Sequence, residues 1–316
     1  MKRNHIMQDI SPDVALEILE TPEKQIPTLL QLSDGMRAEM TSVGISLCSI
    51  INAKSGNCTE DCAFCAQSSV SSASCTPYPM MDGFSILSAR RRAGELGVGH
   101  FSIVTSGSSP TQEELENICG IISRGSELKP FWCASLGLLS LRQLQLLSEA
   151  GLSRYHHNLE TERTYFPEIC TTHTWRDRIN TICNAKLAGL EVCSGGIIGL
   201  GENLRQRVDM AFQLRDLEVD SIALNFLIHL KGTQISSRRE LFSSADLLKT
   251  VIMFGIVCPG AELRVCAGRE LLGEYQKEIF RAGVTGIMTG DLLTTAGSRI
   301  QNDIELLEAA GRIPAS

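Results

Sequence analysis

Short apolar runs alternate along the chain with longer stretches in which apolar residues recur every three or four positions. The short runs are rich in β-branched residues and therefore predict strands. The longer stretches predict helices with one buried face, as with Leu115, Ile118 and Ile122. The predicted strands cover residues 45–52, 100–105, 130–136, 154–159, 190–198, 221–227, 262–267 and 284–288.

Eight predicted strands, each followed by a predicted helix, indicate an α/β fold, a (β/α)8 barrel of the TIM type. The chain is long enough for such a barrel, which typically needs about 250 residues. Functional residues are then expected at the carboxyl ends of the strands. Residues 11–40 come before the first strand and are amphipathic, for example at Ile18 and Leu19. We therefore predict an N-terminal helical extension over residues 1–40, packed outside a barrel domain over residues 41–316.

The composition is that of an ordinary globular protein, with 43% hydrophobic residues and a net charge of −7. A partner nucleic acid is not expected, because phosphate binding needs a basic stripe that the sequence lacks. No apolar run approaches the length of a membrane span, and Lys2 and Arg3 are not followed by an apolar core. We therefore expect a cytoplasmic protein whose twelve cysteines stay reduced for metal binding or catalysis.

Three of these cysteines stand close together, with three residues between Cys58 and Cys62 and two between Cys62 and Cys65. Such a set suits an iron–sulfur cube, in which three cysteines leave one iron open to another ligand. The alternative is a zinc knuckle. Structural zinc sites are closed by four protein ligands, however, and no fourth Cys or His follows at pairing distance. The spacing therefore favours the iron–sulfur cluster.

This loop resembles the signature of the radical S-adenosylmethionine (SAM) superfamily, including the aromatic Phe64 before the third cysteine. The resemblance implies that Cys58, Cys62 and Cys65 hold a catalytic 4Fe-4S cluster, with Phe64 beside the cofactor. It also implies that SAM chelates the open iron and is split to a 5′-deoxyadenosyl radical that abstracts hydrogen from carbon.

Further segments resemble the biotin synthase family over residues 45–295. They are Ala-Gln-Ser directly after the cysteine loop, Tyr-His-His-Asn-Leu-Glu-Thr at 155–161, the glycine-rich stretch at 192–202, and Leu-Arg-Val-Cys-Ala-Gly-Arg-Glu at 263–270. The resemblance implies sulfur insertion into dethiobiotin to form biotin, with sulfur from a sacrificial auxiliary cluster. It further implies reduction by flavodoxin or ferredoxin, and a homodimer.

Five further positions match SAM-binding residues of this family. Glu160 is expected to accept hydrogen bonds from the ribose hydroxyls, and Arg178 to bind the SAM carboxylate through its guanidinium. Gly195, Gly196 and Ile197 are expected to let the backbone approach the cofactor. Taken alone, these residues have simpler explanations: a carboxylate at a helix N-terminus, a solvated arginine, and glycines at a turn.

Three positions match residues that bind the substrate in this family. Asn158 and Asn225 are expected to bind the ureido ring of dethiobiotin, because an amide and a urea each carry both donors and an acceptor. Lys231 follows the sixth predicted strand and is expected to orient the valeryl carboxylate.

The auxiliary cluster is where the sequence departs from the family. The family usually holds a 2Fe-2S cluster with three cysteines and one arginine; Cys133, Cys193 and Arg264 match three of these ligands, but Ser102 stands at the fourth position. A neutral hydroxyl is a poor iron ligand beside thiolates. Two extra thiols, Cys48 and Cys266, lie on the first and seventh predicted strands.

Residues two apart on a strand share a face, so Cys266 points to the same side as Arg264. We therefore predict an auxiliary cluster of the four-iron type held by Cys48, Cys133, Cys193 and Cys266. The alternatives are a 2Fe-2S cluster with Arg264 as a ligand, and extra cysteines that serve only as small buried apolar residues. We assign the remaining cysteines to packing, namely Cys75, Cys119, Cys170, Cys183 and Cys258.

Two rival functions remain open. The first is another radical SAM enzyme on the same barrel, similar to methylornithine synthase or to a hydrogenase maturation protein. The combination of Cys133, Cys193, Asn158 and Asn225 counts against it. The second is a non-catalytic iron–sulfur or zinc carrier, which would have no need of Glu160.

Overall fold

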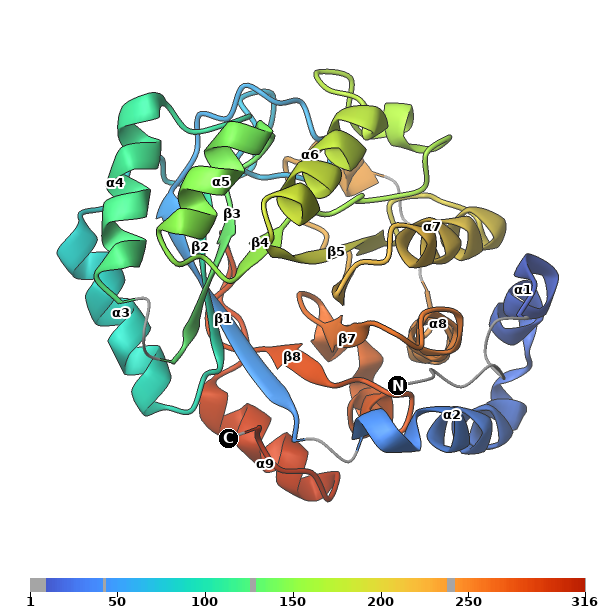
Figure 1. Ribbon diagram of the computed structural model, residues 1–316. Helices are drawn as coiled ribbons and strands as arrows, with labels where there is room; N and C mark the ends of the chain where they lie inside the picture. Colours follow the sequence, from blue (N-terminus) through green and yellow to red (C-terminus); the bar gives the residue numbers. More distant parts are fainter. Residues whose placement is uncertain (1–9, 42–43, 126–128, 238–241, 316) are drawn as a thin grey trace.

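The computed structural model describes residues 10–41, 44–125, 129–237 and 242–315. In this part of the chain eight parallel strands form a closed barrel in sequence order, from β1 beside β2 to β8 beside β1 (Figure 1). The predicted barrel is confirmed. The strands are β1 (Ser46–Lys54), β2 (His100–Thr105), β3 (Phe131–Ser135), β4 (Arg154–His156), β5 (Glu191–Ile198), β6 (Ser221–Phe226), β7 (Glu262–Val265) and β8 (Gly286–Met288).

Strand β4 is the one that differs most from its predicted range of 154–159, because regular structure stops at His156. Pairing with β5 nevertheless continues, since His157 N and Leu159 N donate to carbonyls of that strand at 3.0 and 2.8 Å. Glu160 then adopts a φ of 68°, a left-handed conformation that ends the extended run. Residues 157–160 therefore continue from β4 along the carboxyl end of the barrel.

Helices cover the outside of the barrel. Five of them begin with a Ser, Thr or Asn whose side chain caps the first turn in a reciprocal capping box. The segment after β7 is a kinked 3-10 helix rather than the expected α-helix. The helices are α1 (Pro12–Glu20), α2 (Ile26–Thr41), α3 (Gly83–Glu95), α4 (Gln112–Ser123), α5 (Leu141–Glu149), α6 (Trp175–Leu187), α7 (Leu204–Asp216), α8 (Ser244–Val257) and α9 (Ile300–Ala309), with 3-10 segments η2 (Glu23–Gln25), η3 (Phe166–Glu168), η4 (Gln234–Ser237) and η5 (Arg269–Phe280).

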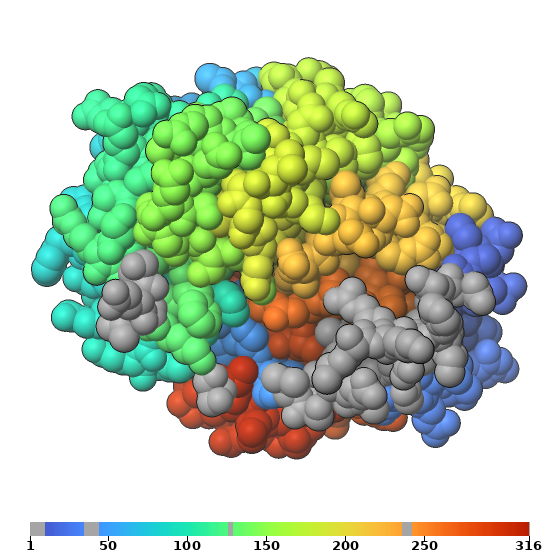
Figure 2. Space-filling view, in the orientation of Figure 1, coloured from blue at the N-terminus to red at the C-terminus, as the bar shows by residue number. Residues whose placement is uncertain are grey.

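The N-terminal helices pack outside the barrel, as predicted. Helix α1 lies against α7 and α8, and α2 lies against α8 (Figure 1). In Figure 2 the blue atoms of the N-terminal segment lie beside the gold atoms of α7. Helix α8 is consequently buried along nearly its whole length. Residues 1–9 of the predicted extension lie outside the described residues, and a domain boundary at residue 40 stays a prediction. None of the described helices is long and apolar enough to cross a membrane.

A buried ion pair fixes the turn after β5. Glu202 and Arg207 lie 2.9 Å apart and are almost fully buried, and Glu202 also accepts the N–H of Gly199 at 3.0 Å. Gly199 and Gly201 both have positive φ angles, and a Cβ at Gly201 would collide with the hydroxyl of Tyr165. The turn at this barrel rim therefore depends on two glycines and on one carboxylate.

We predict that Glu202→Ala lowers the free energy of unfolding of the cluster-free protein by about 3–5 kcal/mol, because it leaves a buried guanidinium unpaired. The matched control is Glu95→Ala. Glu95 forms an exposed pair with Arg91, and its loss should change stability by no more than about 0.5 kcal/mol. Chemical denaturation of the three proteins measures both values. If Glu202→Ala and Glu95→Ala lower the free energy of unfolding by the same small amount, the buried pair does not hold the turn.

Candidate functional site

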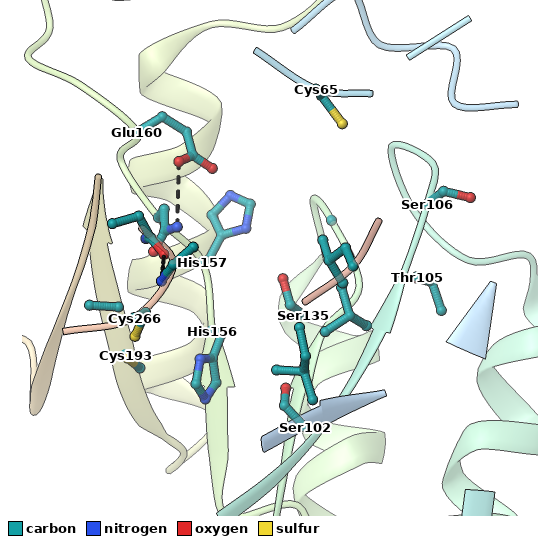
Figure 3. A pocket seen from close by; sticks show the side chains of 18 of the residues that line it. Cys65, Ser102, Thr105, Ser106, Ser135, His156, His157, Glu160, Cys193 and Cys266 are labelled. Carbon is teal, nitrogen blue, oxygen red and sulfur yellow. Dashed lines mark hydrogen bonds between the residues drawn. The ribbon is translucent and has the colours of Figure 1, made fainter. Parts of the chain in front are cut away.

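A cavity of about 340 Å³ runs through the barrel interior, and all eight strands contribute to its wall. Figure 3 shows Cys65 and Glu160 toward one end of the cavity, and Cys193 and Cys266 close to each other further down. Cys65 comes from the loop after β1 and Glu160 follows β4, so this end lies at the carboxyl ends of the strands. The site is therefore placed as expected for a barrel of this type.

The cysteine loop supplies Cys58, Cys62, Phe64 and Cys65 to the cavity wall. Burial raises the pKa of the Cys65 thiol to about 11, so a metal would have to displace its proton. The loop is tied to the segment before α6, because Ala63 N donates to the carbonyl of Ile169 at 2.8 Å. The three thiols are therefore presented to one space by a loop fixed at its centre.

The cysteine loop also contacts Cys170, a contact that was not predicted from the sequence. Cys170 Sγ lies 3.8 Å from Cys62 Sγ and 3.3 Å from Nδ1 of His173. Cys170 is packed in a buried apolar cluster, as predicted, but its contact with Cys62 was not predicted, because a contact between residues 108 positions apart cannot be read from spacing. The assignment of Cys183 to packing is wrong, since this residue is exposed on α6.

Glu160, Asn158 and Arg178 form one hydrogen-bonded group beside the loop. Arg178 Nη1, from α6, donates to the Asn158 carbonyl at 2.9 Å and lies 3.5 Å from Glu160 Oε1. Burial raises the pKa of Glu160 although the charge of Arg178 opposes it. Arg178 Nε is buried and has no hydrogen-bond partner among the described residues. Arg178 and Glu160 both line the cavity, which fits a ligand with hydroxyl and carboxylate groups.

The predicted glycines do not line the cavity. A Cβ at Gly195 would collide with the carbonyl of Ala223, and one at Gly196 with the carbonyl of Glu160. Ile197 also stays outside the lining, and its N–H donates to the Glu160 carbonyl at 2.9 Å. These residues therefore bring β5 close to its neighbours and hold the backbone of Glu160, which is an indirect contribution to the site.

The two predicted substrate amides both reach the cavity. Asn225 is fixed by the backbone, because its Nδ2 donates to the Gly196 carbonyl at 3.3 Å and its Oδ1 accepts Ala267 N at 3.1 Å. Asn158 Nδ2 donates to Glu160 at 3.4 Å. Lys231, in contrast, is exposed and is not part of the cavity wall. Its predicted contact with the substrate carboxylate stays a prediction.

The deeper part of the barrel collects four buried thiols, Cys48, Cys133, Cys193 and Cys266, all of which line the cavity. A hydrogen bond with Cys266 lowers the pKa of Cys48 to about 6, whereas burial raises that of Cys133 to about 12. Ser102 pairs across from Cys133, and its buried hydroxyl has no partner among the described residues. The interior is therefore compatible with the predicted ligand set, in which Cys48 and Cys266 replace the cysteine that is absent at Ser102.

Arg264 lies among these thiols, but its nitrogens are already engaged. Nε donates to Ser221 at 3.0 Å, Nη1 to Ser46 at 3.3 Å and Nη2 to Glu262 at 2.6 Å. Gly286 leaves room for the guanidinium, since a Cβ there would lie 2.7 Å from Nη1. These bonds favour a fixed positive charge over an iron ligand.

A second buried guanidinium was not found from the sequence. Arg154 on β4 pairs with Glu191 at 2.7 Å and with Glu262 at 2.9 Å. Its only sequence signal is that it stands two residues before His156 and so shares the inward face. Burial, together with the charges of the two arginines, lowers the pKa values of His100 and His156 to about 3, so both imidazoles are neutral at neutral pH.

Comparison with known proteins gives a consistent result. The chain matches the family model "Radical SAM superfamily" over residues 53–214 and "Biotin and Thiamin Synthesis associated domain" over residues 223–313. It is 46% identical to a biotin synthase of Acetivibrio thermocellus, over 90% of this chain and 88% of that protein. It is also 43% identical to a biotin synthase of Maridesulfovibrio salexigens, over 96% and 92%.

Solved structures support the fold. A crystal structure of methylornithine synthase matches with a TM-score of 0.84, covering 98% of this chain and 95% of that one. A crystal structure of HydG, a maturase of the [FeFe]-hydrogenase, matches with a TM-score of 0.81, over 97% and 72%. Each is 16% identical, so these likenesses concern the barrel and not its chemistry.

Glu262 pairs with both Arg154 and Arg264, and we therefore predict that the stability of the protein depends on pH. Burial alone would raise the pKa of Glu262, but the charges of Arg264 and Arg154 lower it from 4.5 to about 2. Its stabilising effect is therefore fully present above pH 4.5 and is lost as the pH falls toward 2. We expect Glu262→Gln to lower the denaturation midpoint of the cluster-free protein at neutral pH and to match the wild type near pH 2.

Denaturation series at several pH values check this expectation. Glu95→Gln, at an exposed pair, is the control and should follow the wild type throughout. A difference between Glu262→Gln and wild type that stays constant across the pH range would refute the assigned ionisation.

Proposed function

Because this chain belongs to the biotin synthase family of radical SAM enzymes, we propose that it inserts sulfur into dethiobiotin to form biotin. The observation that carries the proposal is a single cavity with the cysteine loop at one end, four buried thiols deeper inside, and amide side chains in its wall. Relatives at 40–46% identity are biotin synthases, so the methylornithine synthase and maturase alternatives, supported by fold alone, are not favoured.

The family implies a 4Fe-4S cluster and SAM, and the residues present fit both. Cys58, Cys62 and Cys65 would hold the cluster, which supplies the electron that splits SAM into a hydrogen-abstracting radical. The loop places all three thiols on the cavity wall, as such a cluster requires. Its backbone tie to Ile169 keeps them there.

We assign recognition of SAM to the group around Glu160. The carboxylate would accept hydrogen bonds from ribose hydroxyls, while Arg178, whose Nε is free of protein partners in the described structure, would bind the carboxylate end. Phe64 lines the same end of the cavity and would pack against the cofactor. Gly195 and Ile197 support these residues by pairing with the backbone at Leu159 and Glu160.

We assign recognition of the ureido ring to Asn158 and Asn225. The Asn225 amide is held by Gly196 and Ala267, and it keeps one N–H and one oxygen lone pair for a ligand. An amide fixed in this way loses little side-chain entropy when the substrate binds. Because Asn225 lines the same cavity as the loop and the buried thiols, it would hold the reacting carbons between the radical source and the sulfur source.

We propose that Cys48, Cys133, Cys193 and Cys266 hold an auxiliary cluster of the four-iron type that donates the sulfur. Four thiols suit such a cluster without help from an arginine. The donation of Arg264 to three protein partners supports a role in charge balance. A 2Fe-2S cluster with Arg264 as a ligand is the alternative that the experiments below separate.

The remaining features of the proposal concern the protein's surroundings. We propose a cytoplasmic homodimer that is reduced by flavodoxin or ferredoxin and binds no nucleic acid. Its net charge of −7 supports the last point, because nucleic-acid binding depends on clustered positive charge.

Anaerobically reconstituted protein tests the function directly. With SAM, a reductant and dethiobiotin, we expect 5′-deoxyadenosine and biotin; without dethiobiotin, SAM cleavage should fall to background. Cys62→Ala should abolish cleavage, because it removes a ligand of the cluster that reduces SAM. Cys183→Ala, at an exposed site, is the control and should keep full activity. A wild-type protein that never cleaves SAM would support a carrier instead.

The auxiliary ligands are tested by counting iron and acid-labile sulfide per chain. We expect Cys48→Ala and Cys266→Ala to lose the auxiliary iron and sulfide while keeping the loop cluster, because each removes a buried thiolate ligand. Cys258→Ala is the matched control: Cys258 is also buried, but it lies outside the cavity and donates to the Ala211 carbonyl. Unchanged auxiliary content in both interior variants would leave the 2Fe-2S alternative.

A further inference from the structure

Two side chains that the proposed reaction does not use, Cys170 and His173, lie beside Cys62 of the cysteine loop. Cys62, Cys170 and His173 place one ligand atom each within 4.8 Å of one another. Cys62 belongs to the loop, while the other two precede α6. The sequence offered the loop no fourth Cys or His nearby, but the fold supplies both from a distant segment.

The distance between the two thiols fits one shared metal ion. In tetrahedral zinc sites the Zn–S bond is about 2.3 Å, which places two thiolate sulfurs about 3.8 Å apart. Cys62 Sγ and Cys170 Sγ are 3.8 Å apart. A disulfide has an S–S distance of about 2.05 Å, so the two sulfurs are not bonded to each other here. The geometry therefore matches two ligands of a single ion.

The histidine turns its Nδ1 toward the thiols. Nδ1 lies 3.3 Å from Cys170 Sγ, whereas Nε2 lies 3.9 Å from it. Nδ1 also lies 2.5 Å from Glu60 Oε2, and Thr172 donates to the same oxygen at 2.5 Å. An ion bound at Nδ1 would therefore replace the contact with Glu60, whose carboxylate keeps its hydrogen bond from Thr172.

The two segments are also held together independently of these ligands. Ala63 N donates to the Ile169 carbonyl at 2.8 Å, and Asp61 accepts the N–H groups of Thr171 and Thr172 at 2.9 and 3.2 Å. The two segments are thus held beside each other before any ion arrives, and the contact of His173 with Glu60 is the one that binding would change.

We infer that the cluster-free protein binds one zinc ion through Cys62, Cys170 and His173, with water as the fourth ligand. Both thiols bind as thiolates, and their two protons pass to solvent. Cys62 would bind either the zinc ion or the loop cluster, so the zinc ion and the cluster exclude each other. This exclusion rests on the proposed function, whereas the zinc site itself does not. Zinc then occupies the site until the cluster is assembled.

Equilibrium dialysis of the reduced, cluster-free protein against zinc alone tests the site. In Cys170→Ala we expect one zinc fewer per chain and a Kd for that ion raised more than about 100-fold, since even outer partners change metal affinity by about 10- to 100-fold. Cys58→Ala and the exposed control Cys183→Ala should keep the ion. Zinc X-ray absorption of the wild type should report two sulfur ligands and one imidazole.

His173→Ala is the second variant. It keeps both thiols and should weaken binding in the same direction, and thermal unfolding without metal shows whether either variant still folds. Zinc that is lost in Cys58→Ala but kept in Cys170→Ala would place the ion on the loop cysteines and overturn the inference. So would a wild type with no tight zinc.

Anaerobic cluster assembly on zinc-loaded protein tests the exclusion. We expect zinc to be released as iron enters the loop. If zinc depends on Cys170 but stays bound beside a full loop cluster, Cys62 is not a cluster ligand. In that event the proposed function fails and the zinc site stands.

Discussion

The closed barrel imposes the constraint on which the site depends: alternate residues of every strand must point into one enclosed interior. Cys48, Cys133 and Cys193 come from three different strands, yet closure brings them to the same cavity. The same alternation carries Arg154 inward on β4 and Arg264 inward on β7. No single strand contains a site, and the chemistry exists only because the sheet closes on itself.

Enclosure also requires that buried charge be balanced. Two guanidinium groups lie among the interior thiols, and Glu262 pairs with both. Burial, reinforced by the positive charges of these arginines, lowers the pKa values of His100 and His156, so both stay neutral. A cluster with thiolate ligands is negatively charged, and these arginines would stabilise it without becoming ligands. The interior is in this sense prepared electrostatically as well as sterically.

Much of this could be predicted from the sequence, and the limits have physical reasons. The barrel followed from the alternation of strand and helix patterns, and the inward direction of Cys266 followed from its spacing to Arg264. Cys170 and Arg154 were missed, because their roles arise from contacts between segments distant in the chain. Gly195 and its neighbour were assigned to the cofactor, but the structure shows them packed against adjacent backbone instead.

We propose that the barrel interior holds an auxiliary four-iron cluster on cysteine thiolates alone. An anomalous iron difference map from crystals grown anaerobically would locate its metal ions. We expect four iron peaks within bonding distance of Cys48, Cys133, Cys193 and Cys266, in addition to those at the loop. Two interior peaks, with Arg264 as a ligand and Cys48 and Cys266 unbound, would contradict it.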